Sequence, residues 1–404
     1  MKISALQKEI QEELVCNILP FWMRAVDLEN GGYVGQINGK NEMIRQADKG
    51  GILNARILWT FSAAYRVLKQ PVLLANAIRT KEYFLQYFWD HQYGGIYWSC
   101  NFQGNPADTK KQIYVLAFAI YALSEFHRAT GDEETLEKAI QLFRLIEKYS
   151  FDPIKNGYFE AFARDWTPLA DVRLSTKDAN EAKTMNTHLH ILEAYTNLYR
   201  IYPDPELKKQ IENLINLFLY KFIDHSFHLQ LFFTEDWEPR HQIVSYGHDI
   251  EASWLIYEAA FVVENPELLY QIETVILNMA QACFEGIQPD GSMAYELNRE
   301  TGHLDMDRHW WVQAETVVGY VNAFQLSKNA DFLKKAVDCW QYIKNHIIDT
   351  VSGEWFWSIR ADGSVNRNDD KAGIWKCPYH NGRMCMEIRE RFEKNCNKNI
   401  FVHN

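Results

Sequence analysis

The sequence predicts an all-α fold of the (α/α)6-barrel class, in which six inner helices stand inside six outer helices and the long loops carry short β-hairpins. Three observations lead to this prediction. A glycine–aromatic motif recurs at regular intervals, two kinds of helix alternate along the chain, and short links alternate with long ones. We expect the 404 residues to form one catalytic domain spanning 1–404.

The glycine–aromatic motif follows helical segments and sets the repeat. Its copies read "ENGGYVGQI" at 29, "QYGGIYWSC" at 92, "KNGYFEAFA" at 155, "PDGSMAYEL" at 289 and "SGEWFWSIR" at 352. The gap between Gly157 and Gly291 leaves room for one more unit. The stretch "FHLQLFFTEDW" at 227 fills it, keeping the aromatic residues and lacking the glycine. Six supersecondary units are therefore expected.

Each unit contains two helices of different character. One kind is amphipathic, as in 133–148, and residues 3–22, 206–222 and 331–347 follow the same pattern. The other kind is apolar on nearly all sides, as in "ILNARILWTFSAAYRVL" at 52, "IYVLAFAIYAL" at 113, "EASWLIYEAAFVV" at 251 and "VQAETVVGYVNAF" at 312. We expect the amphipathic helices to face water and the apolar helices to be enclosed.

The links indicate which end of the barrel carries function. Links from inner to outer helices are short, as in "LKQP" at 68 and "ATGD" at 129, whereas the links back run over about twenty residues and contain the motif. Long loops carry function more often than short ones. All of them lead into inner-helix N-termini, so these ends should surround the mouth of the barrel.

Polar and aromatic side chains stand at the predicted starts of the inner helices. In chain order they are Arg56, Tyr114, Asn186 and His190, His248 and Glu251, Trp311 and Glu315, and His380. Residues three or four apart share one helix face. The pairs so related are Asn186 with His190, His248 with Glu251, and Trp311 with Glu315. We expect these faces to point inward.

This set suits the abstraction of a proton from a carbon atom next to a carbonyl group. That chemistry needs a base that is neutral near pH 7 and a group that stabilises the oxyanion, which His248 or His380 and Arg56 can provide. A helix N-terminus disfavours imidazolium, whereas Glu251 beside His248 favours it and can orient the ring. The sequence leaves open which effect prevails.

Simpler interpretations exist for each residue taken singly. A histidine at a helix start can be a cap, Glu251 and Glu315 can complement helix dipoles, and Arg56 can belong to a buried ion pair. Their common place in the repeat argues against coincidence. His188 and His190 are two apart and cannot face one metal ion, and the chain lacks H-E-x-x-H and phosphate-binding glycine motifs. We therefore expect no metal and no cofactor.

The composition argues against several classes of partner. A formal net charge of -11 opposes the positive field that nucleic acid requires. The N-terminal stretch "MKISALQKEIQEELVCNILPFW" lacks the apolar run of a signal peptide, and no segment approaches the roughly 20 apolar residues that span a bilayer. Seven cysteines without a C-x-x-C fit a reducing compartment. We expect a cytoplasmic monomer without nucleic-acid or membrane partners.

Six blocks of the sequence, in order, resemble the cellobiose 2-epimerases of the N-acylglucosamine 2-epimerase superfamily. They are "ADKGGILNARILW" at 47, "PADTKKQIYVLAFAIYALS" at 106, "KTMNTHLHILEAY" at 183, "SYGHDIEASWL" at 245, "WWVQAETVVGY" at 310 and "WKCPYHNGRMCMEI" at 375. The resemblance covers essentially the whole chain. It implies a cofactor-free (α/α)6-barrel enzyme that interconverts glucose and mannose at the reducing end of β-1,4-linked disaccharides such as cellobiose, mannobiose and lactose.

The resemblance also implies roles for single residues. His248 and His380 would be the acid/base pair on opposite faces of a cis-enediol, formed after the sugar ring opens. Arg56 would hold the oxygens of that intermediate, and Glu251 and Glu315 would orient the histidines. The residues implied to contact the substrate are Tyr114, Asp178, Asn186 and His190, which bind hydroxyls, and Trp311 and Trp375, which stack on sugar rings.

Three other functions are weighed against this one. The same enediol protonated at C1 would make the protein an aldose–ketose isomerase. The fold class also includes glycoside hydrolases, whose chemistry needs two carboxylates across the scissile bond. A sugar-binding protein without activity would leave His248 and His380 unexplained.

Overall fold

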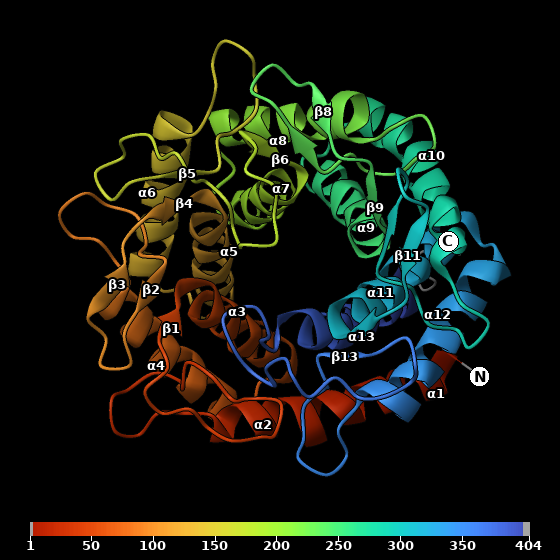
Figure 1. Cartoon of the computed structure of the whole chain (residues 1–404), viewed down its shortest axis with the longest axis horizontal. Coiled ribbons are helices and arrows are strands. Elements are labelled where there is room, and N and C mark those ends of the chain that lie inside the picture. The colour runs from red at the N-terminus through yellow and green to blue at the C-terminus, as the bar shows by residue number, and fades with distance from the viewer. Residues whose placement is uncertain (1–2, 399–404) are drawn as a thin grey trace.

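The computed structural model describes residues 3–398 and shows two concentric rings of helices around a central opening (Figure 1). The inner ring consists of α3 (Gly51–Leu68), α5 (Ile113–Thr130), α7 (Met185–Tyr199), α9 (Tyr246–Val262), α11 (Trp310–Ser327) and α13 (Tyr379–Lys398). The outer ring consists of α1 (Ile3–Glu13) with η1 (Leu14–Ile18) and α2 (Leu19–Arg24), α4 (Pro71–Tyr87), α6 (Glu133–Tyr149), α8 (Pro205–Leu217) with η2 (Phe218–Phe222), α10 (Pro266–Ala282) with η3 (Cys283–Gly286), and α12 (Ala330–Tyr342) with η4 (Ile343–Ile347). The predicted (α/α)6 barrel is confirmed.

Burial of the helices follows their sequence patterns. Every residue of α3 from Gly51 to Ala64 is buried, which explains why this helix is apolar on nearly all sides. By contrast, α6 buries a single stripe that includes Ala139, Phe143 and Ile146. The short links at the far end begin with a left-handed residue, Gly131 after α5 and Lys328 after α11, which turns the chain sharply outward.

The six glycine–aromatic copies form narrow hairpins. Each is marked by one antiparallel bridge: Val26 with Tyr33, Trp89 with Ile96, Phe151 with Tyr158, Ile223 with Leu229, Ile287 with Met293, and Ile348 with Trp355. The copy at 227 is therefore confirmed as a hairpin. Its turn contains Phe227 at φ 65°, in the left-handed region that Gly157 occupies in the third hairpin.

A second set of strands joins neighbouring units, which the sequence does not predict. The strand before each of five inner helices pairs with a strand of the next unit: β1 (Lys49–Gly50) with β2 (Ser99–Cys100), β4 (Lys111–Gln112) with β5 (Ala161–Phe162), β6 (Lys183–Thr184) with β7 (Phe232–Phe233), β9 (Ile243–Ser245) with β10 (Glu296–Asn298), and β12 (Arg308–His309) with β13 (Ser358–Ile359). Three further strands extend these pairs: β3 (Pro106–Asp108), β8 (Pro239–Arg240) and β11 (His303–Asp305). A bridge between Ile37 and Ala372 joins the first unit to the last.

Buried lysines connect four of the hairpins to the segment before the next inner helix, which is a strand in three cases and a loop for Lys371. In each case the ammonium group pairs with the first aspartate of the hairpin, and neither side chain has more than a few per cent of its surface exposed. The pairs are Lys49 with Asp27, Lys111 with Asp90 and Lys183 with Asp152 at 2.8 Å, and Lys371 with Asp349 at 2.6 Å. The loops at the barrel mouth are thereby fixed to the helices that they precede.

A search of the described helices for one long and apolar enough to cross a bilayer finds none.

Candidate functional site

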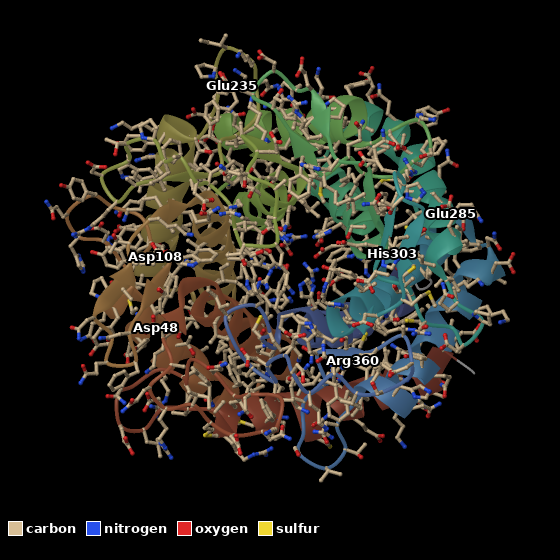
Figure 2. The ribbon with its side chains drawn as sticks, in the orientation of Figure 1. Asp48, Asp108, Glu235, Glu285, His303 and Arg360 are labelled. Atoms are coloured by element: carbon tan, nitrogen blue, oxygen red, sulfur yellow. The ribbon has the colours of Figure 1, made fainter. Side chains whose placement is uncertain are left out.

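A cavity of about 1140 Å³ opens at the end of the barrel where the inner helices begin. Figure 2 shows side chains from the surrounding helices and loops reaching toward the central opening. The structure brings all the predicted site residues together here. Those in its wall are Arg56, Tyr114, Asp178, Asn186, His190, His248, Glu251, Trp311, Trp375 and His380. Glu315 lies behind the wall and is completely buried.

His380 lies at the start of α13 and is hydrogen-bonded to a carboxylate of α11. Its Nδ1 lies 2.7 Å from Oε1 of Glu315, so the ring donates from Nδ1 and keeps the lone pair of Nε2 for other partners. Burial lowers the pKa of His380 well below its usual value, and the positive charges of Arg56 and Arg383 lower it further. The ring is therefore neutral at pH 7.

His248 lies in the first turn of α9 and has a different partner. Its Nδ1 lies 2.8 Å from the hydroxyl oxygen of Ser245. Burial lowers the pKa of His248 to about 3, with a smaller contribution from His190. This ring too is neutral. The expectation that Glu251 orients it is not met, because Glu251 instead contacts Arg383, near the other histidine.

The indole of Trp311 contacts both histidines. Its ring centroid is 4.8 Å from that of His248 and 5.6 Å from that of His380. A Cβ atom added to Gly247 would lie 2.5 Å from this indole, so the glycine before His248 allows the close approach. Both imidazoles consequently border the same part of the cavity.

Arg56 is buried in the cavity wall without a carboxylate beside it. Its Nη2 donates to the hydroxyl of Tyr114 at 2.9 Å, and its guanidinium lies 4.1 Å from the ring centroid of Phe118 and 4.7 Å from that of Tyr379. Within residues 3–393 it forms no ion pair, so the ion-pair interpretation of Arg56 does not apply. Its charge is available to a negatively charged group in the cavity.

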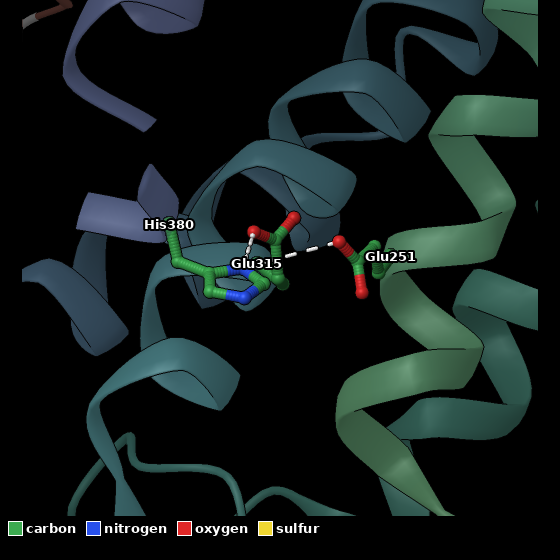
Figure 3. A group of neighbouring side chains, drawn as sticks. All are labelled: Glu251, Glu315 and His380. Atoms are coloured by element: carbon green, nitrogen blue, oxygen red, sulfur yellow. Dashed lines mark hydrogen bonds and ion pairs between the residues drawn. The ribbon is translucent and has the colours of Figure 1, made fainter. Parts of the chain in front are cut away.

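The carboxylates of Glu251 and Glu315 meet near His380 (Figure 3). Oε1 of each accepts a hydrogen bond from Nη2 of Arg383, at 2.5 Å for Glu251 and 2.7 Å for Glu315. These oxygens and His380 Nδ1 lie within 4.8 Å of one another, which is a spacing that metal ligands adopt. Here the guanidinium already supplies the positive charge that a cation would bring to both oxygens.

Glu251 titrates near neutral pH. Burial is the largest cause and the negative charge of Glu315 adds to it, while Arg383 acts in the opposite direction. Together they raise the pKa of Glu251 to about 7. Its Oε1 lies 3.9 Å from His380 Nδ1.

The remaining predicted residues form other parts of the wall. His190 Nδ1 lies 2.9 Å from Oε2 of Glu193, and the edge of Trp375 packs on Tyr114. The side-chain oxygen of Asn186 is buried and has no hydrogen-bond partner among the described residues. Asp178 accepts two hydrogen bonds at 2.8 Å from Ser175, so one of its oxygens already serves the loop 171–181.

Sequence reasoning missed three residues of this arrangement: Arg383, Glu193 and Ser245. A signal for two of them was present. Glu193 follows His190 by three residues and Arg383 follows His380 by three, the same spacing that relates Glu251 to His248. Ser245 precedes α9 and carries no such signal.

Comparison with known proteins adds the following. The family model described as N-acylglucosamine 2-epimerase matches residues 32–382. A cellobiose 2-epimerase of Bacteroides fragilis is 59% identical over 95% of this chain and 98% of its own, and one of Ruminococcus albus is 41% identical over 95% and 98%. The solved cellobiose 2-epimerase of Bacillus thermoamylovorans superposes with a TM-score of 0.92 at 44% identity, covering 96% of this chain and all of that one.

Proposed function

We propose that this chain, which belongs to the N-acylglucosamine 2-epimerase family, epimerises C2 of the reducing-end glucose or mannose unit in β-1,4-linked disaccharides. The named activity of its relatives supports the substrate class. The single observation that supports the chemistry is the placement of His248 and His380. Two neutral imidazoles line one cavity, and both contact the indole of Trp311.

The first step removes the C2 proton from the open-chain sugar. One imidazole takes this proton as the C2–H bond breaks, and the electron pair forms a C1–C2 double bond while the carbonyl oxygen becomes an oxyanion. Arg56 stabilises that oxyanion, because its buried guanidinium has no carboxylate to neutralise it. The product of this step is a cis-enediolate.

The second step returns a proton to C2 from the opposite face. When His380 acts as the base, Nε2 takes the C2 proton while Nδ1 passes its own proton to Glu315, so the ring stays neutral. When it acts as the acid, the same transfers run in reverse, from a ring protonated at Nε2 beside a protonated Glu315. That relay suits a buried site, since burial disfavours an imidazolium. His248 performs the equivalent transfer on the other face, and exchange with solvent resets both groups. Which histidine acts first depends on the epimer bound.

The other wall residues bind the sugar. Trp311 and Trp375 offer apolar faces to the rings, and Tyr114, Asp178, Asn186 and His190 offer hydrogen bonds to hydroxyls. Cellobiose, mannobiose and lactose all carry the reducing-end unit on which this chemistry acts. No metal or cofactor takes part in the proposal. The monomeric state and the cytoplasmic location stay predictions.

The glycoside hydrolase alternative fits the geometry poorly. That reaction needs carboxyl groups on two sides of the scissile bond. Glu251 and Glu315, the two carboxylates predicted to act with the histidines, instead bind the same nitrogen of Arg383. The isomerase alternative uses the same residues and differs only in the carbon that is reprotonated, so the product must decide it.

Product analysis tests the proposal. Purified protein is incubated separately with cellobiose, 4-O-β-D-mannosyl-mannose and lactose, and the sugars are followed by NMR. The proposal predicts that at least one substrate yields the C2 epimer at its reducing end with the glycosidic bond intact. A ketose product would favour the isomerase, released monosaccharide would favour the hydrolase, and three unchanged substrates would refute the proposal.

A further inference from the structure

Arg383 stands at the meeting point of three inner helices besides its own. It is completely buried on α13, one turn after His380, and does not line the cavity. Its Nη2 donates to Glu251 of α9 and Glu315 of α11, and its Nη1 donates to Glu193 of α7. One guanidinium therefore connects carboxylates from three different helices.

Two of these carboxylates also hold imidazoles of the cavity wall. Glu315 accepts a hydrogen bond from Nδ1 of His380 at 2.7 Å, through the same Oε1 that contacts Arg383. Oε2 of Glu193 lies 2.9 Å from Nδ1 of His190, and Oε1 of Glu193 accepts a hydrogen bond from Arg383. Each ring thus presents its other nitrogen, Nε2, to its remaining surroundings.

We propose that Arg383 is a positioning residue, which fixes the orientation and tautomer of His380 and His190 by holding Glu315 and Glu193. This inference rests on the proposed epimerisation and adds a residue to it. Arg383 touches no sugar and moves no proton, and it acts on the reaction through the two carboxylates. The hydrogen-bonded neighbours of metal-bound histidines in other proteins act in the same indirect way.

The geometry requires arginine at this position. A guanidinium is planar and directs its two terminal nitrogens along separate lines, one here to Glu193 and the other to Glu251 and Glu315. It also lies 4.3 Å from the ring centroid of Tyr379 and 4.7 Å from that of Trp254. A lysine keeps the charge but has one nitrogen, which cannot reach all three carboxylates from the same site.

Charged groups face His380 from every inner helix packed around it. They are Arg56 of α3, His190 and Glu193 of α7, Glu251 of α9, Glu315 of α11, and Arg383 of α13. Arg383 is one of the positive charges that keep the ring neutral, and it opposes the rise that burial causes in the pKa values of Glu251 and Glu315. Removing its charge should therefore make His380 easier to protonate.

The first test compares Arg383→Lys with Arg391→Lys. Arg391 lies on the same helix, contacts Asn322 and Glu387, and does not line the cavity, so it is the matched control. We expect Arg383→Lys to lower kcat for cellobiose epimerisation by about 100-fold, the cost of misplacing a reacting group by about 1 Å, with KM within about threefold. The control should keep wild-type constants. An Arg383→Lys variant with wild-type kcat, or one that changes only KM, overturns the proposal.

A second measurement separates positioning from general loss of structure. If Arg383 acts through Glu315, then Arg383→Lys combined with Glu315→Gln should be no slower than the slower single variant. The acidic limb of the kcat/KM profile should also move to higher pH in Arg383→Gln. Fully multiplicative losses together with an unmoved acidic limb overturn the proposal.

A milder variant decides the matter if the Arg383 substitutions fail to fold by circular dichroism. The hydroxyl of Tyr379 donates to Glu193 and accepts from Arg383, so Tyr379→Phe loosens the same arrangement while keeping the ring. A kcat reduced by about tenfold supports the proposal, and wild-type kcat overturns it. Wild-type protein that is inactive on all three disaccharides refutes the proposed function instead, so the two failures are distinguishable.

Discussion

At the scale of single residues, the two histidines of the cavity differ in what holds their Nδ1 atoms. His380 has the carboxylate of Glu315, which belongs to a larger charged group, whereas His248 has only the hydroxyl of Ser245. A carboxylate fixes the tautomer of an imidazole, since it can only accept, while a hydroxyl can donate or accept. His248 can therefore change tautomer more freely than His380.

The pKa values of these groups predict the pH dependence of the reaction. The pKa of His248 lies near 3, below the value of about 6.5 for a free histidine, so the ring stays neutral as pH falls through 6.5. Glu251, with its pKa raised to about 7, loses its proton as pH rises through 7. We expect kcat/KM to hold between about pH 5 and 7 and to fall above that range.

A pH–rate profile on wild type and Glu251→Gln checks this expectation. The glutamine cannot lose a proton, so the variant should be slower and should lack the decline above pH 7. An acidic limb centred at pH 6.5 in wild type would mean that an ordinary solvated histidine controls the rate and would contradict the assignment.

Trp375 should contribute to binding more than to chemistry. It lines the cavity and packs on Trp98 and Tyr114, and within the described part of the chain its indole makes no ring contact with His248 or His380. We expect Trp375→Ala to raise KM for cellobiose by about tenfold, a loss on the order of 1.4 kcal/mol, with kcat within about threefold. Steady-state kinetics measure both constants, and a loss confined to kcat would assign this tryptophan a different role.

Most site residues at the cavity wall could be predicted because they stand at helix starts in the same part of a repeat, whereas the roles of Asp178 and Trp375 were implied by the family resemblance. Arg383, Glu193 and Ser245 could not be assigned from sequence, because their importance depends on partners in other helices or in a loop. Glu193 and Arg383 are far apart in the chain and meet only once the ring has closed. The sequence indicates that a polar side chain in an apolar helix must have hydrogen-bond partners, but it does not identify them.

At the scale of secondary structure elements, the lysine–aspartate pairs are the features that fix the hairpins. Lys111 stands in β4 directly before α5 and reaches Asp90 in the preceding hairpin, with both side chains fully buried. In the fourth unit the partners are exchanged, since His228 of the hairpin pairs with Asp249 of α9 at 2.6 Å. A buried ion pair at this place thus recurs with different residues.

Replacing one partner of such a pair should destabilise the protein more than replacing both. Lys371→Met leaves the buried carboxylate of Asp349 without its lysine, and we expect a loss of about 3 to 5 kcal/mol in the free energy of unfolding. Lys371→Met with Asp349→Leu removes both charges and should recover part of that loss. Urea denaturation of the two variants measures the difference. A double variant less stable than the single one would contradict this, because it would show that the ion pair stabilises the fold by more than the cost of burying its two charges.

The helices and hairpins could be predicted well, whereas the strands between units could not. Helix periodicity extends over many residues, and the glycine–aromatic motif occurs five times with a sixth copy that lacks the glycine. A two-residue strand such as β4 has no period of its own, and its partner β5 lies in the next unit. Its position therefore depends on how the units pack, which local patterns do not encode.

At the scale of the whole molecule, the first and sixth units close the ring. Trp340 and Trp355 of the sixth unit donate from their indole nitrogens to Glu9 at 2.9 Å and Glu13 at 2.8 Å in α1. The bridge between Ile37 and Ala372 adds backbone hydrogen bonds at the mouth. The cavity is thus complete only when the two ends of the repeat meet.

Weakening this closure should lower stability without dividing the unfolding into steps. Trp355→Phe removes one of the two donors to the half-buried Glu13 and leaves Asn17, and we expect a loss of about 1 to 3 kcal/mol, since a hydrogen bond to a carboxylate is lost. If the ring is one cooperative unit, activity and helical circular dichroism should be lost in the same thermal transition. Activity lost well before helix content would instead show that the ring opens separately.

The central claim is that His248 and His380 act on opposite faces of the same C2 atom. The most direct test incubates His248→Ala and His380→Ala separately with cellobiose and with its C2 epimer in D₂O, following deuterium at C2 by NMR. Both variants should lose epimerisation by about 10² to 10⁴-fold, while each still exchanges the C2 proton of one epimer, and a different one for each variant. Exchange of the same epimer by both variants, or epimerisation at the wild-type rate in either, would contradict the account.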